Sequence, residues 1–122
     1  MKTETRSRGG AAASGARSLD APQLEAVAGL FSALSEPSRL QILQILQNGP
    51  ASVGELVERA GMKQANVSKQ LGILLTAGVI ARRQDGNRAI YSIVMPLVFD
   101  LCHLVCQGVA RQAADRAAAL RL

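Results

Sequence analysis

Apolar residues recur at helical spacing through the first part of the chain. From Leu24 to Leu34 they lie three or four positions apart, which predicts an amphipathic helix that follows an Asp20 N-cap and ends near residue 33. The same kind of start signal returns at Ser35-Glu36-Pro37. It predicts a second helix that stops at Asn48-Gly49-Pro50.

Two shorter helices are expected next. Ser52 with Glu55 three positions later forms a capping box, which opens a third helix that Gly61 ends. A fourth helix is predicted from about residue 64 to 77, with Gly78 as its C-terminal cap. Two helices joined by a short turn that contains glycine match a helix-turn-helix.

The spacing of apolar residues then changes from helical to strand-like. Residues 79–84 and 89–94 read as strands, and Asp85-Gly86-Asn87 between them is a strong hairpin signal. Pro96 then opens a last helix, whose apolar residues fall on one side, namely Leu97, Leu101, Leu104, Val105 and Val109. The expected fold class is mainly α with a two-stranded β-hairpin wing, a winged helix-turn-helix.

Composition and charge refine this expectation. The chain has 122 residues, of which 48% are hydrophobic, with two Phe, one Tyr and no Trp, a balance that favours packed helices over a β-sandwich. We expect a disordered tail over residues 1–18 and one domain over residues 19–122. The formal net charge of +5 suggests a polyanionic partner, with nucleic acid first and an anionic membrane second.

No apolar run is long enough to span a bilayer, and the first 20 residues lack the apolar region of a signal peptide. The expected location is therefore the cytoplasm. Cys102 and Cys106 would stay reduced there, so a structural disulfide is not expected.

Three segments, in this order, resemble the ArsR/SmtB family of bacterial repressors. Residues 33–43 (ALSEPSRLQIL) look like its second-helix signature, residues 67–71 (VSKQL) with 77–80 (AGVI) like its recognition helix and exit, and residues 82–91 like its wing. The likeness covers roughly residues 24–109. Gln70 departs from the His that is common there, with little expected effect. The resemblance implies a repressor that binds promoter DNA as a dimer. In the family the first and last helices form the dimer interface.

The residues themselves support DNA binding. A recognition helix lies in the major groove and reads base edges. The candidates for base contact are Gln64, Ala65, Asn66, Ser68 and Gln70, since Asn and Gln can pair with adenine and Ala can meet a thymine methyl. The candidates for phosphate contact are Lys63, Lys69, Arg82, Arg83 and Arg88. Between residues 63 and 88 the only acidic residue is Asp85, so this segment carries a positive charge. For Gln64, Asn66 or Ser68 taken alone, capping and solvating a helix is the simpler interpretation, and the basic hairpin is what favours DNA contact.

Cys102 and Cys106 lie four residues apart on the last helix, so both thiols project from one face. Three readings stay open: simple packing, a sensor that binds As(III) or another thiophilic metal ion, and a sensor of oxidants or reactive sulfur. His103 is a doubtful ligand because adjacent helical residues point about 100° apart. Other site patterns of the family lack their ligands here, since residues 111–114 hold no second His and residues 40–60 hold no Cys.

An enzyme is not expected. His103 cannot easily act as a base for Cys102 from the next helical position, and no glycine-rich phosphate loop or cluster of metal ligands is present in the sequence.

Overall fold

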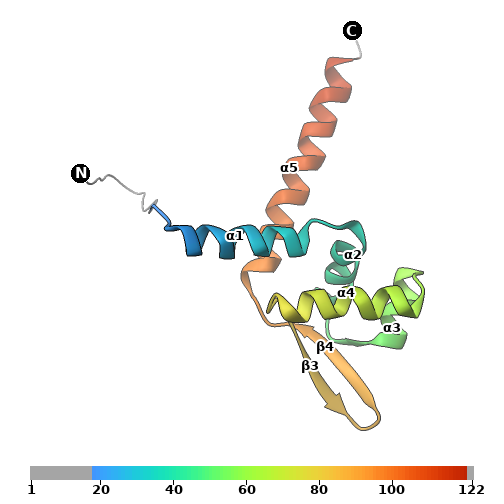
Figure 1. Cartoon of the computed structure of the whole chain (residues 1–122). Helices are drawn as coiled ribbons and strands as arrows, with labels where there is room; N and C mark the ends of the chain where they lie inside the picture. The colour runs from blue at the N-terminus through green and yellow to red at the C-terminus, as the bar shows by residue number, and fades with distance from the viewer. Residues whose placement is uncertain (1–17, 121–122) are drawn as a thin grey trace. The chain divides into compact units, whose positions relative to one another are not determined.

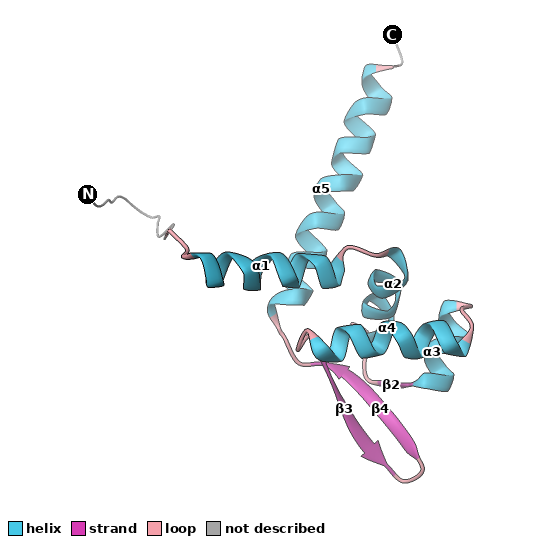
Figure 2. Cartoon of the chain, viewed as in Figure 1, coloured by secondary structure: helices cyan, strands magenta, loops and turns pink. Residues whose placement is uncertain are grey.

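The computed structural model describes residues 18–120 and divides into two compact units, with the boundary between Leu30 and Phe31. Along the chain it forms α1 (Ala21–Leu34), α2 (Pro37–Leu46), β2 (Ala51–Ser52), α3 (Val53–Ala60), α4 (Gln64–Thr76), β3 (Ile80–Asp85), β4 (Arg88–Ile93) and α5 (Leu97–Ala119) (Figures 1 and 2). The predicted tail lies outside the described residues apart from Ser18. The predicted order of helices and the hairpin wing are confirmed.

Local capping explains where the helices begin. Asp20 and Gln23 exchange hydrogen bonds of 2.9 Å between side chain and backbone at the start of α1. The Glu36 carboxylate accepts the backbone N–H of Arg39 at 3.2 Å ahead of α2. These bonds satisfy N–H groups that have no partner inside the helix. The start signals that the sequence predicts are therefore real caps.

The core of the second unit lies between α2, α3, α4 and the small sheet. Its fully buried side chains include Ile42 and Leu43 of α2, Leu56 of α3 and Leu74 of α4. Removing aliphatic side chains such as these from water is the main favourable term in folding. Leu40 of α2 is 44% exposed.

The sheet has three strands rather than the two that were predicted, in the order β2-β4-β3. Gly86 has φ 63° at the hairpin turn, a left-handed conformation that glycine adopts without strain. β2 adds only two residues, which pair antiparallel with Tyr91 and Ile90 of β4. The wing is therefore joined at its base to the segment that leads into α3.

The last helix, α5, is attached to the core through few residues. Val98 is fully buried, while Leu104, Val105 and Val109 are exposed by 67%, 52% and 59%. An aliphatic stripe this exposed is unusual unless another surface covers it. None of the helices in residues 18–120 combines the length and apolarity needed to cross a membrane.

Candidate nucleic-acid interface

The helix-turn-helix consists of α3, a short turn and α4. Gly61 ends α3 with φ 67°, and α4 starts three residues later. Val67 and Leu71 of α4 are buried against the core. This inward packing fixes the orientation of α4 about its own axis, so that its opposite face is presented to solvent.

That outward face carries most of the predicted base-contact residues. Gln64, Ala65 and Ser68 are exposed, and Asn66 is half-buried. Lys63 precedes the helix and Lys69 lies on it, and both are exposed. Amides, a hydroxyl and cations along one helix face are the groups that a major groove and its flanking phosphates accept.

Gln70 does not lie on this face, which corrects the sequence analysis. Its side chain is only 6% exposed. The reason is its position on the helix: three residues after Val67 and four before Leu74, it falls on the apolar stripe. A direct contact between Gln70 and a base is therefore not supported.

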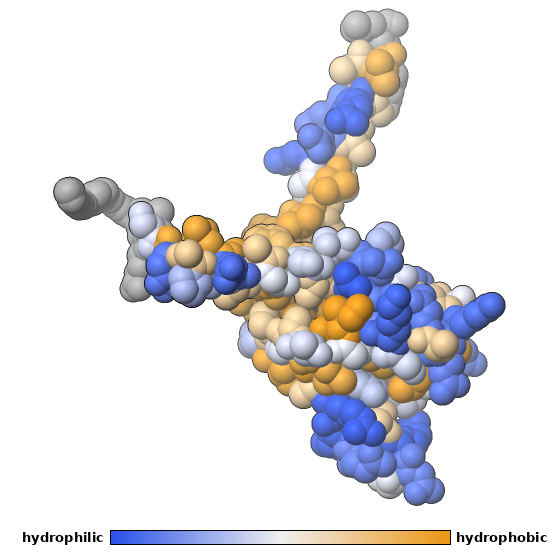
Figure 3. Space-filling model, viewed as in Figure 1, coloured by the Kyte–Doolittle hydropathy of each residue, from blue (hydrophilic) through white to orange (hydrophobic). Residues whose placement is uncertain are grey.

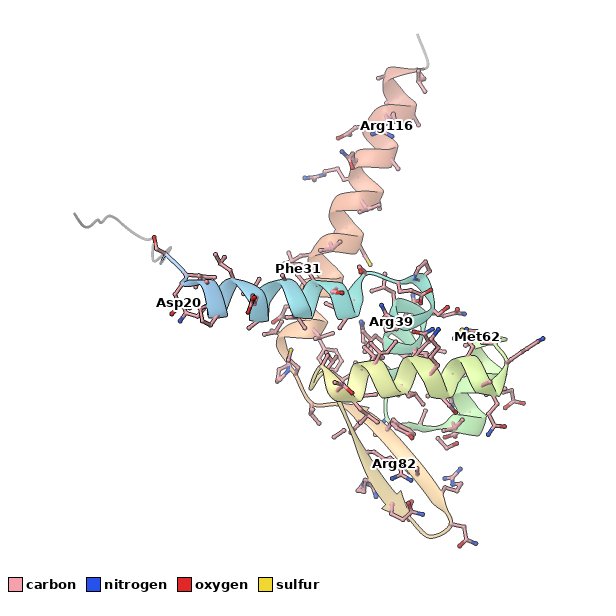
Figure 4. The ribbon with its side chains drawn as sticks, in the orientation of Figure 1. Asp20, Phe31, Arg39, Met62, Arg82 and Arg116 are labelled. Atoms are coloured by element: carbon pink, nitrogen blue, oxygen red, sulfur yellow. The ribbon has the colours of Figure 1, made fainter. Side chains whose placement is uncertain are left out.

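Gln70 is instead part of a chain of hydrogen bonds that sequence reasoning missed. Arg39 of α2 donates to the Gln70 Oε1 at 2.7 Å, and the Gln70 Nε2 donates to the Asn66 Oδ1 at 2.9 Å. Figure 4 shows Arg39 on α2, beside α4. The sequence did contain a signal for these bonds, namely a polar residue within the apolar stripe of the helix. A buried amide requires a hydrogen-bond partner.

The wing carries the predicted arginines. Arg82 and Arg83 on β3, and Arg88 at the start of β4, are all exposed. Successive residues of a strand point to opposite faces, so Arg82 and Arg83 extend from both sides of the hairpin. In Figure 3 hydrophilic residues gather over the wing, and Figure 4 marks Arg82 there. The hairpin thus presents positive charge over much of its surface.

Arg88 differs from the other two arginines because acidic side chains lie near it. It lines an open groove of about 490 Å³ with Glu55 and Glu58 of α3. Two hydrogen bonds from Ser52 hold the pKa of Glu55 below its usual value, and the positive charges of Arg88 and Arg59 lower it further. The negative charge of Glu55 therefore offsets part of the positive potential around Arg88.

Cys102 is half-buried and Cys106 is exposed, and both are free thiols on α5. Burial raises the pKa of the Cys102 thiol, and the neighbouring Cys106 raises it further. His103 is exposed on the same helix. Within residues 18–120 no three or more His, Cys, Asp or Glu side chains gather where a metal ion could be held. One copy of the chain thus offers a pair of soft ligands rather than a complete site.

Comparison with known proteins agrees with this architecture. Residues 36–82 match the family model described as bacterial regulatory protein, arsR family. The chain is 41% identical over 100 residues to the uncharacterised HTH-type transcriptional regulator Rv0081 of Mycobacterium tuberculosis, covering 81% of this chain and 88% of that one. It is 40% identical to a probable mercury resistance operon repressor of Streptomyces lividans, covering 79% of this chain and 74% of that one.

Solved structures show the same fold. The crystal structure of Rv0081 superposes with a TM-score of 0.73 at 39% identity, covering 80% of this chain and 99% of that one. The solution structure of the homodimeric winged helix-turn-helix DNA-binding domain of Mb0332 from Mycobacterium bovis gives a TM-score of 0.69 at 33% identity, covering 79% and 88%. The chain therefore belongs to the ArsR family of bacterial regulatory proteins, and it is a winged helix-turn-helix transcriptional regulator rather than an enzyme.

Proposed function

We propose that the protein represses transcription as a homodimer bound to promoter DNA, and that a thiophilic metal or metalloid ion releases it. The observation that carries the DNA-binding part is the combination, within one structural unit, of an exposed polar face on α4 and an arginine-bearing wing. In this arrangement α4 enters the major groove and the wing lies along the backbone. A regulator of bacterial promoters acts where the chromosome is, so we place it in the cytoplasm.

The base contacts come from the exposed face of α4. Gln64 and Asn66 have amides that can bond base edges, Ser68 has a hydroxyl, and Ala65 is small enough to meet a thymine methyl. All four lie in the first turns of the helix, which is the part of a recognition helix that reaches the bases.

The phosphate contacts come from cations around that face. We assign this role to Lys63, Lys69, Arg82, Arg83 and Arg88, which are all exposed. Each neutralised phosphate releases condensed counterions, so these residues contribute affinity that falls with salt and depends little on sequence.

A dimer accounts for the exposed apolar residues. On α1, Leu24 and Phe31 are 55% and 54% exposed, and on α5 the stripe around Leu104 is also exposed. Figure 3 shows apolar residues on the surface of both helices. The homodimer of the Mycobacterium bovis relative supports this arrangement. Two copies would read two half-sites about one helical turn apart.

The two cysteines supply the ligands for release. Cys102 and Cys106 are soft donors of the kind that As(III), Hg(II), Cd(II) or Cu(I) prefers, and two copies together would offer four. The similarity to a probable mercury resistance operon repressor supports a thiophilic ion. The ion would lower DNA affinity by the ratio of its affinities for free and DNA-bound protein.

The raised pKa of Cys102 weighs against oxidant sensing. Redox-sensor cysteines react as thiolates with low pKa values, whereas burial raises the pKa of Cys102 and so disfavours its thiolate. A metal ion displaces the thiol protons itself, so it is less affected by a high pKa. Metal-dependent release is therefore the better-supported of the two sensing functions.

A titration of labelled DNA from the gene's own upstream region tests both parts. Reduced protein is added with and without stoichiometric As(III) or Hg(II), and the double variant Cys102→Ser/Cys106→Ser is the matched control. Tight binding that the ion weakens only in the wild type supports the proposal. Equal release of wild type and variant contradicts the cysteine site. If no DNA is bound above background, a genome-wide footprint decides whether an operator lies elsewhere.

A further inference from the structure

A continuous chain of hydrogen bonds runs from the end of α1 to the start of α4. The Arg39 Nε donates to the Ala33 carbonyl at 2.6 Å, and its Nη2 donates to the Ser32 carbonyl at 3.3 Å. The Arg39 Nη1 bonds Gln70, which bonds Asn66. The Asn66 Nδ2 in turn lies 3.4 Å from the Met62 sulfur, just ahead of α4 in Figure 4.

Arg39 determines which group donates and which accepts in each of these hydrogen bonds. A guanidinium has only N–H donors, so the amide of Gln70 must turn its oxygen toward Arg39. The nitrogen of Gln70 then faces Asn66, and the oxygen of Asn66 must accept from it. With its oxygen turned toward Gln70, Asn66 presents its NH₂ group on the other side, where only the weak thioether acceptor of Met62 engages it.

Burial holds this orientation in place. Gln70 is 6% exposed and has Val67 and Leu74 as buried neighbours on its helix face. Turning its amide over would bring its NH₂ group against the guanidinium, which also has only N–H donors, so the buried bond to Arg39 would be lost. Arg39 is itself fixed by the two carbonyls that it bonds.

We propose that Arg39 and Gln70 are positioning residues that determine base preference, because they fix the Asn66 amide with its donor side toward DNA. This inference rests on the proposed function, in which α4 reads the major groove. An unrestrained Asn pairs with adenine through both amide atoms. With its oxygen committed to Gln70, Asn66 instead donates to an acceptor edge, and guanine presents two acceptors, O6 and N7.

The substitution Gln70→Glu reverses the direction of the hydrogen bond to Asn66 without removing the bond. The new carboxylate still pairs with Arg39 but has no N–H to donate. Asn66 must then turn its nitrogen toward the carboxylate and its oxygen toward DNA. The preferred base at one position in each half-site should move from guanine to a base with an amino group, adenine or cytosine. We expect the ratio of affinities to change by about 5- to 150-fold, the range of one specific base contact.

The experiment selects bound sequences from a library of randomised half-sites with the full-length wild type, the Gln70→Glu variant and a Gln44→Glu control. Gln44 is exposed on α2, so this control adds the same charge outside the hydrogen-bonded chain. A change of base at one position with Gln70→Glu alone supports the inference. An unchanged base preference, or equal weakening of binding to all sequences, overturns the inference but not the proposed DNA-binding function.

A second variant and one further outcome complete the test. If Gln70→Glu does not fold, Gln70→Met replaces it, because a Met of similar volume frees Asn66 to pair with adenine and should weaken the guanine preference. Retained guanine preference in that variant overturns the inference. A wild type that selects no sequence at all overturns the proposed function, and the inference falls with it.

Discussion

Ser52 belongs to two elements at once, since it pairs with Ile90 across the β2–β4 ladder and its hydroxyl accepts the backbone N–H of Glu55 at the start of α3 at 3.2 Å. The Glu55 carboxylate returns a bond to the backbone N–H of Ser52 at 2.8 Å. The base of the wing and the first helix of the helix-turn-helix are thus fixed to each other through one residue.

Replacing this residue should destabilise the protein. Ser52→Ala removes the cap of α3 and is expected to lower the free energy of unfolding by about 1 kcal/mol. Urea denaturation at one fixed protein concentration measures the loss, because a dimer's stability depends on concentration. Ser52→Thr, which keeps the hydroxyl, is the matched control. Equal stability of Ser52→Ala and wild type would contradict the capping role.

Glu55 should make stability depend on pH in the acid range. Its pKa in the folded state lies below the ordinary 4.5, mainly because of the bonds from Ser52. Its contribution is therefore fully present above pH 4.5 and is lost as the pH falls through the lower folded value. The stability difference between wild type and Glu55→Gln should shrink as the pH is lowered over this window. Parallel denaturation curves at all pH values would argue that the carboxylate has no such role.

The arginines of the wing should differ in their effect on DNA binding. Arg83→Ala is expected to weaken binding to all sequences alike and to reduce the slope of log K against log salt by about 1. Arg88→Ala should have a smaller effect, because part of its charge acts on Glu55. Binding measured at several salt concentrations tests this, with Arg116→Ala on α5 as control. An unchanged slope for Arg83→Ala would refute its phosphate contact.

A charge in the apolar stripe of α5 should break the dimer. Leu104 is 67% exposed in the single chain, and Leu104→Glu would place a carboxylate in the proposed interface. Sedimentation at micromolar concentration should show a dimer for the wild type and a monomer for this variant. Ala113→Glu, farther along the exposed part of α5, serves as a comparison. A wild type that sediments as a monomer would count against the dimer itself.

Metal binding by the cysteines should strengthen with rising pH. Burial and the neighbouring Cys106 raise the pKa of Cys102, so an ion must displace its proton across the neutral range. Apparent affinity should rise by about tenfold per pH unit for each thiol proton displaced. Titration of Hg(II) into the wild type and into Cys102→Ser measures this, and the variant should show a shallower dependence. Identical slopes would mean that Cys102 is not a ligand.

Local signals explain which elements could be predicted from the sequence. Asp20, Glu36 and Ser52 cap helices through bonds to residues three positions away, so short-range spacing is sufficient to find them. β2 could not be found in this way. It is two residues long, and only its partner strand, some forty positions later, makes it a strand.

The candidate site was predicted in part for the same reason. The exposed residues of α4 follow from helical periodicity, and that periodicity also places Gln70 inward, although its polarity suggested otherwise. The role of Arg39 depends on Gln70, which lies 31 residues away in sequence. No local pattern specifies a bond of that kind, because it forms only when α2 and α4 pack together.

The position of β3 at the edge of the sheet has a consequence for the behaviour of the protein at high concentration. Edge strands offer backbone groups with which another chain can pair, and charged side chains on such a strand oppose that pairing. Arg82 and Arg83 lie on this edge, so the same cations that we assign to phosphates also protect the wing against aggregation. A variant with a neutral wing would thus lose solubility as well as affinity for DNA.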